Sequence, residues 1–141
     1  MHIMTNINKK YMDLAFFYAK MAYNLNEVPI GAVIVKDDEV VSYGFNLKEK
    51  NNSVLDHAEI IAIKEAARKL NNWRLDGCEI FVTLEPCKMC KSAIEQARIS
   101  KIYVGTLDDK AKMANPDVSL EEGILKEECS EILKSFFKRK R

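Results

Sequence analysis

The spacing of apolar residues in the first half of the chain predicts a helix followed by a hairpin. From Tyr11 the apolar residues recur every three or four positions, which predicts an amphipathic helix that cannot continue past Pro29. The runs 31–35 and 39–43 are rich in β-branched residues and are joined by the polar stretch 36–38. This pattern predicts two antiparallel strands directly after the helix.

A second amphipathic helix is expected over residues 57–70. Ser53 and Asp56 precede it and offer side-chain oxygens that suit the cap of a helix N-terminus. Apolar residues at helical spacing predict the face that it buries, which consists of Ile60, Ile61, Ile63, Ala67 and Leu70. This helix would begin with the sequence His57-Ala58-Glu59.

The second half of the chain predicts a strand, a helix, another strand and a final helix. Residues 79–84 form a short apolar run before a proline, which is typical of a buried central strand. Residues 88–98 have helical spacing and residues 101–105 are β-rich, an order that predicts a right-handed parallel crossover. The Ser-x-x-Glu sequence at 119–122 resembles a capping box and predicts a last helix that ends near Phe137. These elements predict an α/β fold in which helices cover both faces of a small sheet.

Length and composition bound the class of protein. A chain of 141 residues is expected to form one domain, residues 1–141, and 48% hydrophobic with 30% charged residues is ordinary for a soluble globular protein. Without a secretory leader or a bilayer-spanning stretch, a cytoplasmic protein with no membrane partner is expected. The net charge of +1 means that a nucleic-acid partner needs a local basic patch. Residues 138–141 form such a patch, and a solvated tail explains them equally well.

The positions of cysteine and histidine indicate a metal site. Two of the four cysteines form the pair Cys87-x-x-Cys90, which favours metal or thiol chemistry over disulfides when no secretory leader is present. The only other histidine, His2, lies at a terminus that is expected to fray, so His57 is the one imidazole that suits this pair. His57, Cys87 and Cys90 make three ligands, the number typical of catalytic zinc sites, which keep a fourth position for water.

Glu59 supplies the remaining chemistry that a hydrolytic site needs. It lies two positions after His57 at the start of the same helix, so both side chains can reach one pocket. Two thiolates cancel the charge of zinc, so water at such a site is acidified weakly and a nearby carboxylate must take its proton. Carrying protons from that water to a ring nitrogen and to departing ammonia is the shuttle that hydrolytic deamination requires.

Each of these residues also has an ordinary interpretation when it is considered alone. A lone Cys-x-x-Cys occurs in redox motifs and structural zinc sites, a lone His57 is more often a core or capping residue, and Glu59 would usually be solvated. The combination of His-x-Glu with a later Pro-Cys-x-x-Cys is the recognised signature of zinc nucleobase deaminases, and it favours that class. Cys78 and Cys129 are better interpreted as small buried apolar residues.

Most of the chain resembles the bacterial tRNA adenosine deaminases, which make inosine at the anticodon wobble position. The matching stretches are 27–33 (EVPIGAV), 44–46 (GFN), 57–60 (HAEI), 72–75 (NWRL), 82–90 (VTLEPCKMC), 122–125 (EGIL) and 136–139 (FFKR). The resemblance implies a cytidine-deaminase-like fold with three α/β/α layers and a mixed, mostly five-stranded sheet. It also implies a homodimer, one Zn²⁺ per subunit, and an adenine flipped out of the tRNA anticodon loop to face the metal.

The resemblance also implies roles for individual pocket residues. The resemblance implies that Asn46 hydrogen-bonds the base and that Ala58 and Glu59 hold its reacting edge. Val28 and Leu84 would be pocket walls, and Asp108 would lie near the mouth of the site. Asn46 also suits a turn after a strand, which is its ordinary interpretation. For Asp108 the ordinary interpretation is a solvated acidic turn.

Two features depart from the family, and the first of them leaves the substrate open. The segment between Lys110 and Glu122 is shorter than usual on the side expected to contact nucleic acid, and Asp56 stands where the family has a small residue. A second hypothesis is therefore a deaminase of a free nucleobase or nucleoside, of the guanine or cytosine type. A third is a zinc-binding partner subunit without turnover, although an intact Glu59 argues against it.

Overall fold

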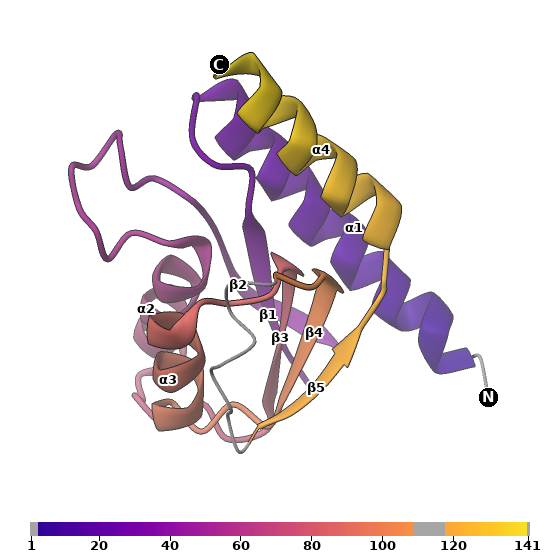
Figure 1. Ribbon diagram of the computed structural model, residues 1–141. Coiled ribbons are helices and arrows are strands. Elements are labelled where there is room, and N and C mark those ends of the chain that lie inside the picture. The colour runs from indigo at the N-terminus through magenta and orange to yellow at the C-terminus, as the bar shows by residue number, and fades with distance from the viewer. Residues whose placement is uncertain (1–2, 109–117, 141) are drawn as a thin grey trace.

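The hairpin expected after the first helix forms one side of a five-stranded sheet in the computed structural model, which describes residues 3–108 and 118–140 (Figure 1). Strands β1 (Gly31–Lys36) and β2 (Glu39–Phe45) pair antiparallel. The two residues that join them, Asp37 and Asp38, have φ values of 52° and 64°. Two-residue turns with positive φ at both positions match the twist of paired strands, so this turn sets the hairpin register.

The other side of the sheet is parallel. The strand order is β2-β1-β3-β4-β5, in which β3 (Cys78–Leu84) is antiparallel to β1 and parallel to β4 (Lys101–Thr106). Helix α3 (Lys88–Gln96) connects β3 to β4, because neighbouring parallel strands need a crossover connection. The parallel strand–helix–strand unit and the mixed five-stranded sheet are therefore confirmed.

The segment expected to cap the last helix is instead the edge strand β5 (Ser119–Glu122), which pairs parallel with β4. The prediction of a capping box at this place is wrong. Leu120 packs against the core while its neighbours are exposed, so the alternation of a half-buried strand outweighs the capping motif. Helix α4 (Lys126–Arg139) begins only after Leu125, whose φ is 58°.

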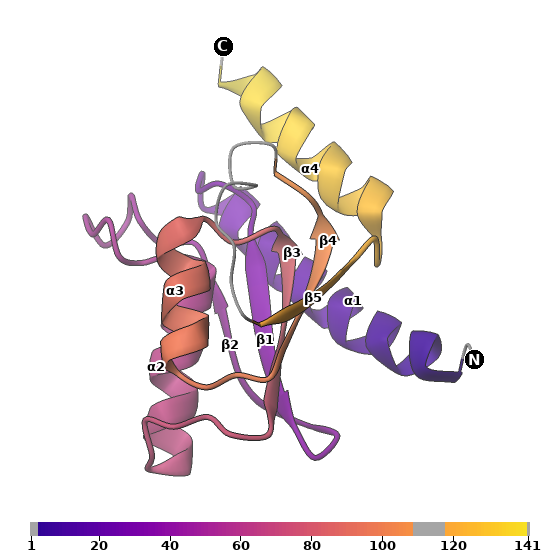
Figure 2. The ribbon, with the colours of Figure 1, turned by 60° about the horizontal axis from the view of Figure 1, so that its bottom comes forward.

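Helices cover both faces of the sheet and give the three α/β/α layers that the sequence predicts. Helix α1 (Ile3–Asn24) lies with α4 on one face, and α2 (Ala58–Leu70) lies with α3 on the other (Figure 2). Helix α1 already runs from Ile3, well before the expected start at Tyr11. Within the described part of the chain, no helix has both the length and the apolar character needed to cross a membrane.

Two apolar clusters hold these layers together. The larger cluster lies between the sheet and the pair α2 and α3, and it includes Ile34, Ile80, Val82, Ile94, Ile102 and Val104. The smaller cluster lies between the sheet and α1, and it includes Tyr11, Met12, Val33, Phe81 and Tyr103. Successive residues of β1 and β3 enter opposite clusters, as the period of two along a strand requires, so both faces of these central strands are buried.

Helix α2 packs against the sheet mainly through alanines. Its buried residues include Ala58, Ala62 and Ala66, whereas the predicted face of Ile60, Ile61, Ile63, Ala67 and Leu70 is only half-buried. A Cβ added to Gly44 of β2 would lie 2.3 Å from the Ala58 carbonyl oxygen. The helix therefore approaches the strand too closely for large side chains at this contact. Of the predicted face, Ile63 and Leu70 pack against the larger cluster, but the prediction misses the alanines that lie closest to the sheet. This close packing fixes the first turn of α2.

Candidate metal centre and active site

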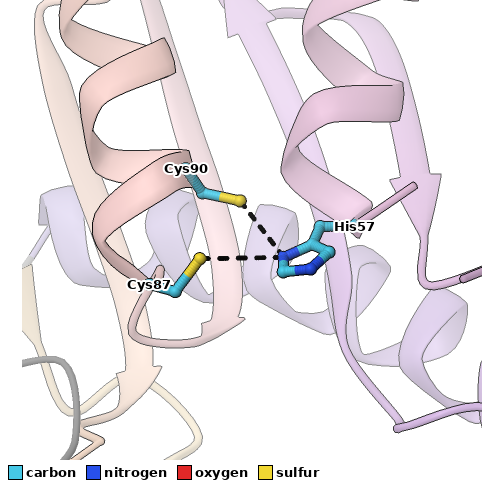
Figure 3. Close-up of side chains that lie close together, drawn as sticks. All are labelled: His57, Cys87 and Cys90. Carbon is cyan, nitrogen blue, oxygen red and sulfur yellow. Dashed lines mark hydrogen bonds between the residues drawn. The ribbon is translucent and has the colours of Figure 1, made fainter. Parts of the chain in front are cut away.

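Two helices begin at the same place, beside the end of strand β3. Helix α2 starts immediately after His57, and α3 starts immediately after Cys87, with Cys90 in its first turn. Figure 3 shows the three side chains pointing toward one another from these two helix starts. The N-terminal end of a helix carries partial positive charge and free N–H groups, so this position favours thiolates over thiols.

His57, Cys87 and Cys90 come together as the sequence predicts. The Nδ1 atom of His57 lies 3.4 Å from the Cys90 Sγ atom and 3.8 Å from the Cys87 Sγ atom (Figure 3). The three donor atoms all lie within 4.8 Å of one another. Sulfur and imidazole nitrogen are donors that Zn²⁺ prefers in proteins. A cluster of three, among the residues that the structure describes, fits a catalytic zinc site better than a closed structural one.

The two cysteines differ in acidity because they share a hydrogen bond. The bond from the Cys90 thiol is the main factor that lowers the pKa of Cys87 to about 5, and backbone N–H groups of α3 and His57 lower it further. The same hydrogen bond and burial raise the pKa of Cys90. Cys87 is therefore a thiolate at neutral pH, and Cys90 holds the proton that a metal ion displaces on binding.

Glu59 lies in the first turn of α2 and is 3% exposed. Burial raises the pKa of its carboxyl to about 7; a hydrogen bond from its own backbone N–H opposes this shift, and the charge of Cys87 adds to it. Its Oε1 atom is buried and has no hydrogen-bond partner within residues 3–108 and 118–140. Such atoms are rare in folded proteins because they are costly, so this oxygen fits a site that binds a polar ligand.

A pocket of about 690 Å³ reaches Glu59 and two of the three donor residues, His57 and Cys87. Its volume is in the usual range of small-molecule sites, roughly 300–1,000 Å³. Besides Cys87, the lining includes six residues that the sequence singles out, together with one residue of α4 and the residue that follows this helix: Val28, Asn46, His57, Glu59, Leu84, Asp108, Phe136 and Lys140. Cys87 also lines the pocket, whereas Cys90 and Ala58 are fully buried and do not.

Asn46 both lines the pocket and caps helix α2. Its Oδ1 atom accepts a hydrogen bond of 2.8 Å from the Ala58 backbone N–H, one of the N–H groups that have no partner within the helix. The prediction that Ser53 or Asp56 caps this helix is wrong. The Asp56 carboxylate instead accepts a hydrogen bond from the Asn51 side chain within the preceding loop. Asn46 lies next to α2 only because strand β2 ends there, which local sequence does not reveal.

Two further carboxylates at this pocket are buried, which the sequence does not predict. Glu27 accepts hydrogen bonds from the backbone N–H groups of Glu49 and Lys50, at 3.0 Å and 2.6 Å, and so holds the loop before α2. Glu85 accepts one from the Asp108 backbone N–H at 3.0 Å. Acidic residues are usually exposed, and their use as backbone acceptors becomes visible only in the fold. The one sequence signal that points to these two carboxylates is that they adjoin Val28 and Leu84, the expected pocket walls.

Comparison with known families matches residues 5–106 to the cytidine and deoxycytidylate deaminase zinc-binding region. The matched part contains His57, Glu59, Cys87 and Cys90. The chain belongs to this deaminase family. The family's zinc-binding region contains the cluster of His57, Cys87 and Cys90. These three side chains of the deaminase are therefore positioned to bind zinc.

Individual members of the deaminase family resemble the chain over most of its length. A tRNA-specific adenosine deaminase from Aquifex aeolicus strain VF5 is 41% identical over 142 residues, which cover 93% of this chain and 94% of the relative. One from Bacillus subtilis strain 168 is 37% identical over 143 residues, covering 93% and 89%. A solved structure described under A-to-I editing by tRNA:A34 deaminases has a TM-score of 0.83 and 37% identity, covering 88% of this chain and 99% of that one. The cytidine-deaminase-like fold is therefore confirmed.

Most of the short segment between Lys110 and Glu122 lies outside the described residues.

We predict that Cys87→Ala binds less than about a tenth of the zinc that the unchanged protein binds, because two ligands hold the ion far more weakly than three. Zinc per chain, measured by elemental analysis after dialysis, checks this. Cys78→Ala is the matched control, because Cys78 is also buried but lies outside the cluster. Equal zinc contents in the two variants would show that the cluster is not the zinc site.

Proposed function

We propose that this chain is a zinc-dependent hydrolytic deaminase that converts adenosine to inosine at the wobble position of tRNA. Glu59 carries the proposal, because within the described residues it is a buried carboxylate with an unpartnered oxygen in the pocket that holds the three-donor cluster. Membership of the deaminase family supports the reaction, and the relatives named tRNA-specific adenosine deaminase support the substrate.

Hydrolytic deamination replaces the amino group of a base with the oxygen of water and releases ammonia. Zinc held by His57, Cys87 and Cys90 would supply a Lewis acid that activates water near neutral pH. Glu59 takes one proton from the attacking water at its free oxygen and passes it to the ring nitrogen, and it then takes the second proton from the added oxygen and passes it to the departing amine. Because Glu59 is buried, bulk water does not compete for the proton between these two steps.

The pocket walls suit a flat base with polar edges. Val28 and Leu84 supply apolar walls, and Asn46 supplies an amide. Helix α2 occupies the Asn46 oxygen, so the amide NH₂ is the group that would donate to a ring nitrogen of the base. Ala58 is fully buried, and its contribution is to fix this amide through its backbone N–H. Asp108 lines the pocket and would contact the nucleotide outside the base.

A second groove favours a polynucleotide over a free base. This groove has a volume of about 780 Å³ and shares Val28, Leu84 and Asp108 with the first pocket. Its other walls include the exposed side chains of Leu107 and Phe137 and the lysines Lys134 and Lys138. Unpaired RNA bases stack on exposed aromatic rings, and lysines bind phosphates. Nucleotides next to the reacting adenosine would therefore bind along α4.

The active form that we propose is a homodimer in the cytoplasm, with one zinc per subunit. Val54 and Leu55 are 68% and 56% exposed, and they lie in the loop that supplies Lys48 and Lys50 to the pocket. Apolar side chains gathered at one exposed place are typical of a surface that another chain covers. The tRNA substrate supports a cytoplasmic location. Light scattering should give the mass of two chains, and the mass of a single chain at micromolar concentration would refute the dimer.

We predict that Glu59→Gln keeps its zinc but loses turnover by about a thousandfold, because an amide retains the shape of the carboxylate and cannot carry the proton. Zinc content and initial rates of inosine formation check this. Glu65→Gln, on the same helix but outside the pocket, is the control and should keep its rate. Undiminished turnover in Glu59→Gln would remove the proton shuttle from the mechanism, and lost zinc would make Glu59 a ligand instead.

We also predict that the purified protein forms inosine in an anticodon stem-loop RNA with adenosine at the wobble position. The same RNA with guanosine there is the control, and free bases and nucleosides should release no ammonia. Because lysines contact phosphates, raising the salt from about 50 to 200 mM should lower kcat/KM by tenfold or more. Ammonia released only from small substrates would establish the free-base alternative, and no turnover by zinc-loaded protein would favour the partner-subunit alternative.

A further inference from the structure

A buried ion pair lies next to the cluster of His57, Cys87 and Cys90 and has no part in the chemistry described so far. The Nζ atom of Lys91 lies 2.5 Å from the Oε2 atom of Glu85, and the two side chains are 4% and 8% exposed. Lys91 follows Cys90 directly on helix α3, and Glu85 precedes Cys87 by two positions. The pair therefore links the helix that bears the cysteines to the end of strand β3.

Stability alone does not explain a pair at this place. Taking two opposite charges out of water is costly, and their mutual attraction often fails to offset the loss of hydration. Apolar side chains of similar volume usually serve a core equally well or better. Buried pairs of this kind fix geometry most clearly when further hydrogen bonds engage the charged groups.

The Glu85 carboxylate has such a further hydrogen bond, and it is to the wall of the pocket. While Oε2 binds Lys91, Oε1 accepts the backbone N–H of Asp108 at 3.0 Å. The Glu85 backbone N–H in turn donates to the Thr106 carbonyl oxygen at 2.9 Å. One residue thus ties the segment that leaves β4 to the segment that leads into Cys87.

The segment that leaves β4 forms a wall shared by the deaminase pocket and the groove along α4. Asp108 lines both cavities, and Leu107 lines the groove. Glu85 itself lines the deaminase pocket. A Glu85 carboxylate that lost Lys91 would no longer be held toward Asp108, and it would place negative charge where a phosphate backbone approaches.

We propose that Lys91 is a positioning residue that holds Glu85 against the Asp108 backbone, and that it thereby sets the affinity for the polynucleotide substrate. It does not contact the reacting atoms. The proposal rests on the proposed function for its substrate, whereas the link from Lys91 through Glu85 to Asp108 stands on the contacts alone. The zinc site and the proton steps at Glu59 are expected to work without it.

The first test needs no substrate, so it separates this proposal from the proposed function. Hydrogen exchange of the Asp108 backbone amide, measured by NMR on the zinc-loaded protein, should be about tenfold faster in Lys91→Met than in the unchanged protein. Lys91→Arg, which keeps the charge and donors, should restore slow exchange. Lys64→Met replaces an exposed lysine of α2 and is the control. Unchanged exchange in Lys91→Met would overturn the proposal.

The second test separates a positioning role from a merely structural one. In Lys91→Met the KM for the stem-loop RNA should rise by about fivefold or more, while kcat stays within about twofold and zinc remains bound. Loss of zinc, or a fall in kcat at unchanged KM, would place the role of Lys91 in the metal site or in the chemical step and overturn the proposal. Lys64→Met should change neither constant by more than about twofold.

A second variant keeps the proposal testable if Lys91→Met does not fold. The double variant Lys91→Met with Glu85→Met removes both charges and leaves apolar side chains of similar length, so no unpaired charge is buried. It also lacks the carboxylate that binds Asp108. Fast exchange at Asp108 together with a raised KM is therefore expected here too, and slow exchange with an unchanged KM would overturn the proposal.

Discussion

The meeting of two helix N-termini beside the end of strand β3 is the arrangement on which the site depends. Helix α2 brings His57 and Glu59 to this point, and α3 brings Cys87 and Cys90. The helix ends supply positive potential where thiolates are needed, and the Cys87 thiolate is favoured before any ion is present, whereas Cys90 keeps a proton that a metal displaces. Close packing of α2 on Gly44 and the central position of β3 in the sheet hold this point in place.

Three buried carboxylates surround the pocket, and their different partners give them different tasks. Glu27 and Glu85 are engaged by backbone N–H groups, so each fixes a segment of the pocket wall. Glu59 instead keeps one oxygen without a partner among the described residues, which leaves it available for a ligand. The contrast follows from hydrogen bonding: satisfied carboxylates build the site, and the unsatisfied one is left to react.

The sequence predicts those parts of the protein that depend on local patterns and on residue chemistry. The order of strands and helices follows from apolar periodicity, and the cluster of His57, Cys87 and Cys90 follows from ligand type and number. Errors arise where tertiary contacts outweigh a local motif. Ser-x-x-Glu at 119–122 becomes a strand because β4 offers an edge, and Asn46 caps α2 because β2 ends beside it. The burial of Lys91 is not predicted either, because lysine side chains are almost never buried unless they are paired, and only the fold shows that Glu85 is the buried partner.

The central claim is that two cysteines and one histidine hold a zinc ion whose fourth position stays open for water. X-ray absorption spectroscopy at the zinc edge of the purified protein tests this claim most directly, because it counts sulfur and lighter neighbours of the metal. The account predicts two sulfur neighbours and two nitrogen or oxygen neighbours, one of which exchanges with added ligand. Four sulfur neighbours, or a shell without sulfur, would contradict it.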